Sequence, residues 1–332
     1  MVWSITAGVS TSLRRGLSYF PAVALLVVLS LTLMSCTLST SEDARADQGT
    51  SEIDNNLIIV TSVYAAYDFS RTITGENAHV SFLLPPGVEP HSFEPSPTDI
   101  HLLNRADILI CAGGDSDTWL DKILATLDNP DLRVIKMCDL VETQVEVAID
   151  ETATDEHEVD VHVWTSLRNA QIIVEYLASS FAGIDSQNAG LFQANARELI
   201  DQLVALDVRI TKIVENAKRT TVIFGDRFPF RYFAADYGLT WYAAFSGCST
   251  AVDTDPKTLV GLIEMVHAHK VPAVFYLELS NQRIARTISE ETGAEMLLFH
   301  SIHTVSKDDF EAGLTYLDLM QSNADNLEVA LN

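Results

Sequence analysis

The sequence NAGLFQANARELIDQLVALDVRITKIVENAK, residues 188–218, is the longest periodic stretch of the chain. Its apolar residues recur at spacings of four and three, which places them on one face of an α-helix. These residues are Phe192, Ala196, Leu199, Leu203, Leu206, Ile210, Ile213 and Ala217. A helix of roughly 30 residues is roughly 45 Å long. The stripe fits a coiled-coil seam or a helix packed along two lobes. We favour the second, because an apolar strand pattern resumes at Thr221.

Short apolar runs alternate with helical patterns on both sides of this helix. The expected strands cover 57–61, 80–84, 108–112 and 133–137 before it, and 221–224, 240–244, 273–277 and 295–299 after it. A closing helix is expected over 308–331. This alternation predicts an α/β fold with two lobes, each a mainly parallel sheet flanked by helices, joined by one long rigid helix. We place the lobes at 57–184 and 220–332 and the linking helix at 185–219.

Charge excludes one class of partner. The 332 residues include 46 acidic and 21 basic side chains, for a net charge of −25. Nucleic-acid binding requires patches of Lys and Arg, so no nucleic acid is expected. The negative charge would attract cations, but a generally acidic proteome or a salty habitat would explain it equally well. The stretch 142–160 holds eight acids and reads as a mobile acidic loop, either a weak cation collector or a solvated surface.

The N-terminus has the features of a secretion signal. Arg14 and Arg15 precede an apolar run of mostly Ala, Val and Leu that ends in Leu-Met-Ser-Cys at Cys36. The run is too short for a comfortable membrane span and fits a signal peptide over 1–35. The cysteine context resembles a bacterial lipobox, so Cys36 is expected to carry lipid, with 36–56 as a flexible tether. The folded protein would then be lipid-anchored on the extracytoplasmic face of the cell membrane. The alternative is a signal anchor with an incidental cysteine.

Candidate ligand residues follow the predicted strands. In LLPPGVEPHSFEPSPTDIHLL, residues 83–103, a proline-stiffened loop presents His91, and His162 directly precedes a helix start. Asp226, Glu278 and His300 stand at the ends of strands in the second lobe. Ligand sites in open α/β sheets form at these carboxyl ends, and imidazoles with carboxylates suit Zn²⁺, Mn²⁺ or Fe²⁺. His303 is three residues past His300 and could replace it.

The cysteines suggest no thiolate site. Cys111 and Cys138 lie in or beside neighbouring strands of one lobe, and Cys248 lies in the other. Burial as small apolar residues is the favoured state of such cysteines, although a disulfide is possible outside the cytoplasm.

Four motifs together resemble one family. They are PGVEPHSFEPSP (86–97), DVHVW (160–164), FRYFAADYGL (230–239) and ETGA (291–294). No single one is specific, but together they resemble the substrate-binding lipoproteins of bacterial zinc/manganese ABC importers, the cluster A-I group, over residues 57–331. The resemblance implies a protein that is not an enzyme. It implies a monomer that captures one divalent cation, Zn²⁺ first and Mn²⁺ possible, and passes it to a membrane permease. The stiff linking helix implies a small rotation of the lobes instead of a wide hinge.

The resemblance also implies a ligand set. His91 and His162 match the first two metal ligands. The third, usually histidine, falls on Arg227, whose guanidinium cannot bind a cation, so Asp226 is the expected substitute. The fourth position falls on His300. Glu278 or His303 are held in reserve for the third and fourth ligands.

Other functions remain as alternatives. A lipid-anchored zinc-dependent hydrolase would use the same ion, with an open position for water, but the sequence has no His-Glu-x-x-His pair. A carrier of Mn²⁺ or Fe²⁺ with the same fold would use the same side chains. Adhesion is a third possibility, since related lipoproteins have been described as adhesins.

Overall fold

A computed structural model describes residues 56–88, 93, 95–114, 117–146, 159–247, 249 and 254–332. The residues from Asp54 to Asn332 form one compact unit. The predicted signal peptide, Cys36, His91, Cys248 and most of the acidic loop lie outside the described residues. None of the described helices has the length and apolarity needed to cross a membrane.

The first sheet has four parallel strands in the order β2-β1-β3-β4. Its strands are β1 (Leu57–Thr61), β2 (Ala78–Phe82), β3 (Ile108–Cys111) and β4 (Arg133–Lys136). Its helices are α1 (Tyr64–Thr74), α2 (Pro97–Leu103) and α3 (Thr118–Leu124). A 3₁₀ turn, Val163–Thr165, then leads into α4 (Leu167–Ile184). The α4 start was predicted correctly, because the Ser166 hydroxyl accepts from Asn169 N at 3.0 Å and so caps the helix.

The second sheet repeats this arrangement with strand order β6-β5-β7-β8, again all parallel. Its strands are β5 (Thr221–Phe228), β6 (Thr240–Ser246), β7 (Ala273–Tyr276) and β8 (Glu295–Leu298). Its helices are α6 (Arg231–Tyr237), α7 (Pro256–His269), α8 (Arg283–Thr292), α9 (Lys307–Glu311) and α10 (Tyr316–Leu331). The predicted α/β class is confirmed: the chain has two parallel sheets, and a long helix joins them in the sequence.

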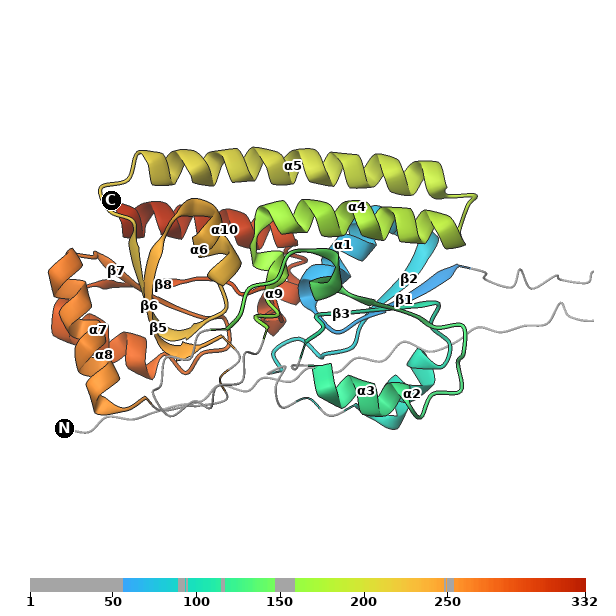
Figure 1. The fold of residues 1–332 in the computed structure, drawn as a ribbon, viewed down its shortest axis with the longest axis horizontal. Helices are drawn as coiled ribbons and strands as arrows, with labels where there is room; N and C mark the ends of the chain where they lie inside the picture. Colours follow the sequence, from blue (N-terminus) through green and yellow to red (C-terminus); the bar gives the residue numbers. More distant parts are fainter. Residues whose placement is uncertain are drawn as a thin grey trace, which may run out of the picture. The chain divides into compact units, whose positions relative to one another are not determined.

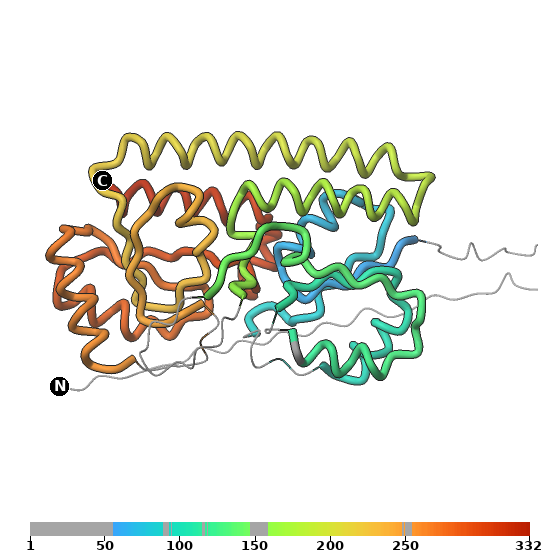
Figure 2. The backbone as a smooth tube through the Cα atoms, in the orientation of Figure 1, coloured from blue at the N-terminus to red at the C-terminus, as the bar shows by residue number. Residues whose placement is uncertain are grey.

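Alternating strand residues divide the interior into layers. In β3, Ile108 and Ile110 face one layer, and Leu109 and Cys111 face the other. The first layer packs against α1, α4, α5 and α10 and is a single buried cluster that includes residues of both sheets. Helices α2 and α3 cover the opposite face of the first sheet, and α7 and α8 cover that of the second. Figures 1 and 2 show α5 running past both sheets on the side of this shared core.

Helix α5 (Ala189–Glu215) is the predicted long helix. Its predicted stripe from Phe192 to Ile213 is buried, whereas Ala217 follows the end of the helix. The helix contacts α4, α1 and α10. It therefore packs against helices that flank both sheets, and it is not part of a coiled coil.

Several predicted bounds differ from the structure: β2, for example, begins and ends two residues earlier than predicted. Two further differences have a structural cause. β5 runs four residues beyond the predicted end, through Phe228, with an irregular register between Phe224 and Arg227. The strand passes α8 closely here, since a Cβ on Gly225 would lie 2.5 Å from Ala285 Cα. The predicted closing helix is split into α9 and α10 because Gly313 has a positive φ of 73°.

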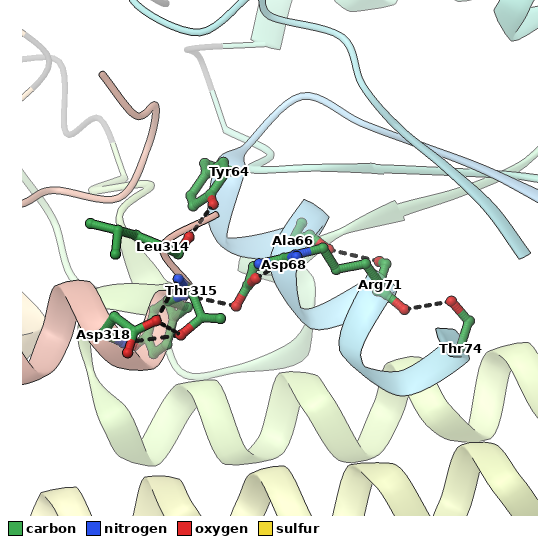
Figure 3. Close-up of polar contacts among 10 residues, drawn as sticks. Tyr64, Ala66, Asp68, Arg71, Thr74, Leu314, Thr315 and Asp318 are labelled. Atoms are coloured by element: carbon green, nitrogen blue, oxygen red, sulfur yellow. Dashed lines mark hydrogen bonds and ion pairs between the residues drawn. The ribbon is translucent and has the colours of Figure 1, made fainter. Parts of the chain in front are cut away.

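A polar cluster joins α1 to the start of α10 (Figure 3). Asp68 is 1% exposed, and its carboxylate accepts from the Tyr316 backbone N–H and from Arg71 Nε, each at 2.7 Å. The Tyr64 hydroxyl donates to the Leu314 carbonyl oxygen at 2.5 Å. These bonds connect the helix after β1 with the start of the last helix, α10.

We expect Asp68→Ala to lower the free energy of unfolding by about 2–4 kcal/mol, because a buried N–H loses its acceptor and Arg71 loses its partner. Urea denaturation measures the loss. Asp131→Ala removes an exposed aspartate and should change stability by less than about 0.5 kcal/mol. Equal effects of the two substitutions would contradict the structural role of Asp68.

Candidate metal site

A small cavity of about 40 Å³ is lined by the end of β5, by residues that follow β6, β7 and β8, and by His162, which precedes α4. This volume is enough for a water molecule or an ion. The lining side chains able to bind or repel a cation are His162, Asp226, Arg227, Glu278 and His303. The cavity therefore lies at the carboxyl ends of the strands of the second sheet, where Asp226 and Glu278 were predicted as candidate ligands.

His162 enters the cavity from the 3₁₀ turn before α4, and Asp160 fixes its ring. His162 Nδ1 lies 2.9 Å from Asp160 Oδ1, which also accepts from the His162 backbone N–H at 2.9 Å. Both residues are buried. A carboxylate only accepts hydrogen bonds, so Nδ1 carries a proton, and in the neutral ring Nε2 has the lone pair. Metal-binding histidines are oriented in this way, and Nε2 is available as a ligand.

Segments of the second sheet hold this pair in place. The Tyr232 hydroxyl, from α6, donates to the Asp160 carbonyl oxygen at 2.5 Å. Burial raises the pKa of Tyr232, so the hydroxyl keeps the proton that it donates. Gly247, directly after β6, approaches the ring so closely that a Cβ there would lie 3.3 Å from His162 Cε1. The position of His162 thus depends on residues from both sheets.

His303, in the segment after β8, is the second imidazole of the cavity. Its ring is 5.6 Å from that of His162, centre to centre, at 73°. Two imidazoles on one tetrahedral zinc, with Zn–N distances of about 2.1 Å, have ring centres about 5 Å apart. The indole of Trp164 contacts both rings, at 5.4 and 5.1 Å. The two imidazoles are therefore spaced to share one ion.

His300 does not line this cavity. It is buried, and its backbone is held by Asn323, whose Oδ1 accepts from His300 N at 2.7 Å and whose Nδ2 donates to His300 O at 2.9 Å. The structure therefore brings His303, one of the two alternative ligands named from the sequence, beside His162. His91, the other predicted ligand of the first lobe, lies outside the described residues.

The two carboxylates that line the cavity differ in the number of hydrogen bonds that their oxygens accept. Asp226, at the irregular part of β5, accepts one bond on each oxygen, from Arg227 N at 2.9 Å and Leu277 N at 3.2 Å. Glu278, after β7, accepts two bonds on Oε1 and one on Oε2. A carboxylate oxygen has two lone pairs, so both oxygens of Asp226 keep one for a metal.

Arg227 brings a permanent positive charge to the cavity wall. Its Nε donates to the Ser249 carbonyl oxygen. The guanidinium cannot be a ligand, and its charge beside a bound cation is offset by Asp226 and Glu278.

Within the described ranges, no three His, Cys, Asp or Glu side chains are grouped as a complete metal site. The predicted set includes His91, which these ranges omit. Cys111 and Cys138 are free buried thiols, and burial raises the pKa of both, that of Cys138 to about 12. Neither thiol lines the cavity.

A family model described as the zinc-uptake complex component A, periplasmic (ZnuA), matches residues 59–330. The chain belongs to this family. The resemblance inferred from the four motifs is thereby confirmed. The ZnuA family consists of solute-binding proteins, so the prediction of a protein that is not an enzyme is confirmed as well.

Several ZnuA-family relatives resemble the chain along most of its length. The zinc-binding lipoprotein AdcA of Streptococcus pneumoniae is 30% identical over 278 residues, which cover 82% of this chain but only 55% of AdcA. The chain thus spans about half the length of that relative. The high-affinity zinc uptake system protein ZnuA of Bacillus subtilis is 27% identical over 307 residues, 91% of this chain and 94% of that protein.

Solved structures support the same assignment. The Zn(II)-bound ZnuA-like domain of the Streptococcus pneumoniae AdcA superposes with a TM-score of 0.69 at 28% identity, covering 83% of this chain and 99% of that domain. A Mn-bound periplasmic metal-binding protein from Candidatus Liberibacter asiaticus, 22% identical with a TM-score of 0.71, shares the fold, covering 83% of this chain and all of that one.

Proposed function

We propose that this protein captures one zinc ion in the cavity and delivers it to an ABC permease. The observation that supports this most directly is the pair of imidazoles, His162 and His303, whose rings lie 5.6 Å apart on the wall of one small cavity. One follows the first sheet and the other the second, so a shared ion would bridge the two halves of the fold. Membership of a zinc-uptake family gives the same assignment.

We propose His91, His162, His303 and Asp226 as the ligands. His303 replaces His300 because it lines the cavity, and Asp226 is preferred to Glu278 because each of its oxygens keeps a free lone pair. Three imidazoles and one carboxylate are ligands that zinc accepts in tetrahedral sites. Manganese and iron accept the same donors, and a Mn-bound relative has this fold.

The proposal extends to the whole chain. Residues 57–184 and 220–332 act as two lobes joined by the 185–219 helix, and lipid on Cys36 holds the protein outside the cytoplasmic membrane, beside its permease. Related proteins are named lipoproteins. Expression of the full chain and of Cys36→Ala tests the anchor: only the unchanged chain should acquire fatty acid and remain with membranes. Equal fractions of both in membranes would argue against lipidation.

Calorimetry on the chain beginning at Asn56 tests the site. We expect one zinc ion per chain, bound with micromolar or tighter affinity, and weaker binding of Mn²⁺ under the same conditions. Tighter binding of Mn²⁺ than of Zn²⁺ would favour the manganese alternative. Zinc binding unchanged in both His162→Ala and His303→Ala would exclude this cavity.

We expect Asp160→Asn to weaken zinc binding by about 10- to 100-fold, because the carboxylate that orients His162 and increases its basicity is lost while the side-chain shape is kept. Zinc titration by calorimetry measures the change, and circular dichroism checks that the fold is retained. Asp139→Asn alters an exposed aspartate and should leave the affinity unchanged. If Asp160→Asn binds zinc normally, the Asp160 carboxylate does not contribute to metal binding.

A further inference from the structure

The segment Ser301–His303 is fixed through its carbonyl groups by residues of the first half of the chain. The Ser301 carbonyl accepts from Trp164 Nε1 at 2.9 Å. The carbonyls of Ile302 and His303 accept from the backbone N–H groups that open α1, at 3.2 and 2.9 Å. Three consecutive carbonyls thus have partners outside the second sheet.

The N–H groups of the same segment are held by Glu278. Ser301 N donates to Glu278 Oε2 at 2.9 Å, and Ile302 N donates to Oε1 at 3.2 Å. The Ser301 hydroxyl also donates to Oε1, at 2.6 Å. One carboxylate therefore accepts three bonds from two adjacent residues, immediately before His303.

Ile302 has an unusual backbone conformation. Its φ is +58° and its side chain is 1% exposed. A β-branched residue is strongly disfavoured in this left-handed region, and such a conformation persists only where the surroundings impose it. Because Ile302 N is bonded to Glu278, the carboxylate acts directly on the strained residue. The conformation of Ile302 sets the direction in which the next residue, His303, leaves the backbone.

We propose that Glu278 is a positioning residue for metal binding: it holds Ile302 in the left-handed conformation and so directs His303 toward His162. Glu278 does not itself bind the ion. This inference rests on the proposed function, because it takes His303 as a ligand. The bonding supports positioning over ligation, since Oε1 of Glu278 accepts two bonds from the segment and has no lone pair left, and Oε2 accepts a third bond.

Hydrogen exchange on the metal-free protein tests the clamp without reference to zinc. Glu278→Ala removes all three acceptor sites, and the Ser301 and Ile302 amides should exchange at least about 10-fold faster than in the unchanged protein. Glu278→Gln keeps one acceptor oxygen and should give an intermediate rate. Glu290→Ala alters an exposed glutamate of α8 and should change neither amide. Unchanged exchange in Glu278→Ala would overturn the proposal.

Zinc binding and zinc X-ray absorption separate positioning from ligation. We expect Glu278→Ala to bind zinc about 10- to 100-fold more weakly and to show one imidazole fewer around the ion, as His303→Ala does. Glu278→Gln should restore most of the imidazole signal. Loss of an oxygen donor with every imidazole retained would overturn the proposal by making Glu278 a ligand. If Glu278→Ala does not fold, Glu278→Gln decides by the same measurements.

Failure of the two proposals gives different results. If the unchanged protein binds no zinc, the proposed function is wrong, yet hydrogen exchange still decides whether Glu278 holds the segment. If the unchanged protein binds zinc and Glu278→Ala has normal affinity and normal imidazole number, only the positioning role is wrong.

Discussion

Replacing His162 by alanine is expected to weaken zinc binding by about 100- to 1000-fold. Structural zinc sites with four protein ligands have apparent binding free energies of about 10–16 kcal/mol, or about 2.5–4 kcal/mol for each ligand. The Nε2 lone pair of His162 would supply one such ligand, and the buried Asp160 holds this ring in place. Competition with a fluorescent chelator of known zinc affinity measures the change.

The matched control is His267→Ala, which removes an exposed histidine of α7 that does not line the cavity. It should bind zinc as the unchanged protein does. Equal affinities of the His162 and His267 variants would place the zinc site elsewhere.

Replacing Trp164 by alanine is expected to lower the free energy of unfolding by about 3–5 kcal/mol, the usual cost of removing a large buried aromatic side chain. The indole is fully buried, contacts the rings of His162 and His303, and donates to the Ser301 carbonyl. The loss therefore removes both packing and a buried hydrogen bond. Urea denaturation of the metal-free protein measures it.

Two further variants separate the contribution of the hydrogen bond from that of packing. Trp164→Phe keeps an aromatic ring but no donor and should cost about 1–3 kcal/mol, because the Ser301 carbonyl loses its partner. Tyr176→Ala, on α4, removes a side chain that is 45% exposed and should cost much less. A loss of less than about 1 kcal/mol in Trp164→Ala would contradict the role of the indole as a link between the halves.

The fold could be predicted because its signals are local and repeated. The stripe of α5 and the alternation of apolar strands with helices follow from side-chain periodicity, which burial on one face requires. His162 could be placed because a capped helix start directly follows it. The break between α9 and α10 was missed because Gly313 lies within an otherwise helical pattern, where a glycine either is tolerated or ends the helix.

The second half of the site could be predicted only in outline. His300 and His303 are three residues apart, and the family resemblance favoured His300 for the fourth ligand. In the structure His303 lines the cavity and His300 does not, and His303 directly follows the left-handed Ile302, whose N–H is bonded to Glu278. A positive φ at isoleucine runs against local preference, so it follows from tertiary contacts that a single sequence does not reveal. The extension of β5 to include Asp226 depends in the same way on the neighbouring strands.

The apolar cluster that passes without interruption from one sheet to the other limits how this protein can exchange its ion. A wide separation of the two halves would expose these apolar side chains to water, and the free-energy cost would grow in proportion to the exposed area. Uptake and discharge of the metal should therefore proceed by rearrangement of the loops around the cavity. A transporter that must tell the loaded carrier from the empty one would then have to sense those few surface loops, since the outline of the carrier would change little.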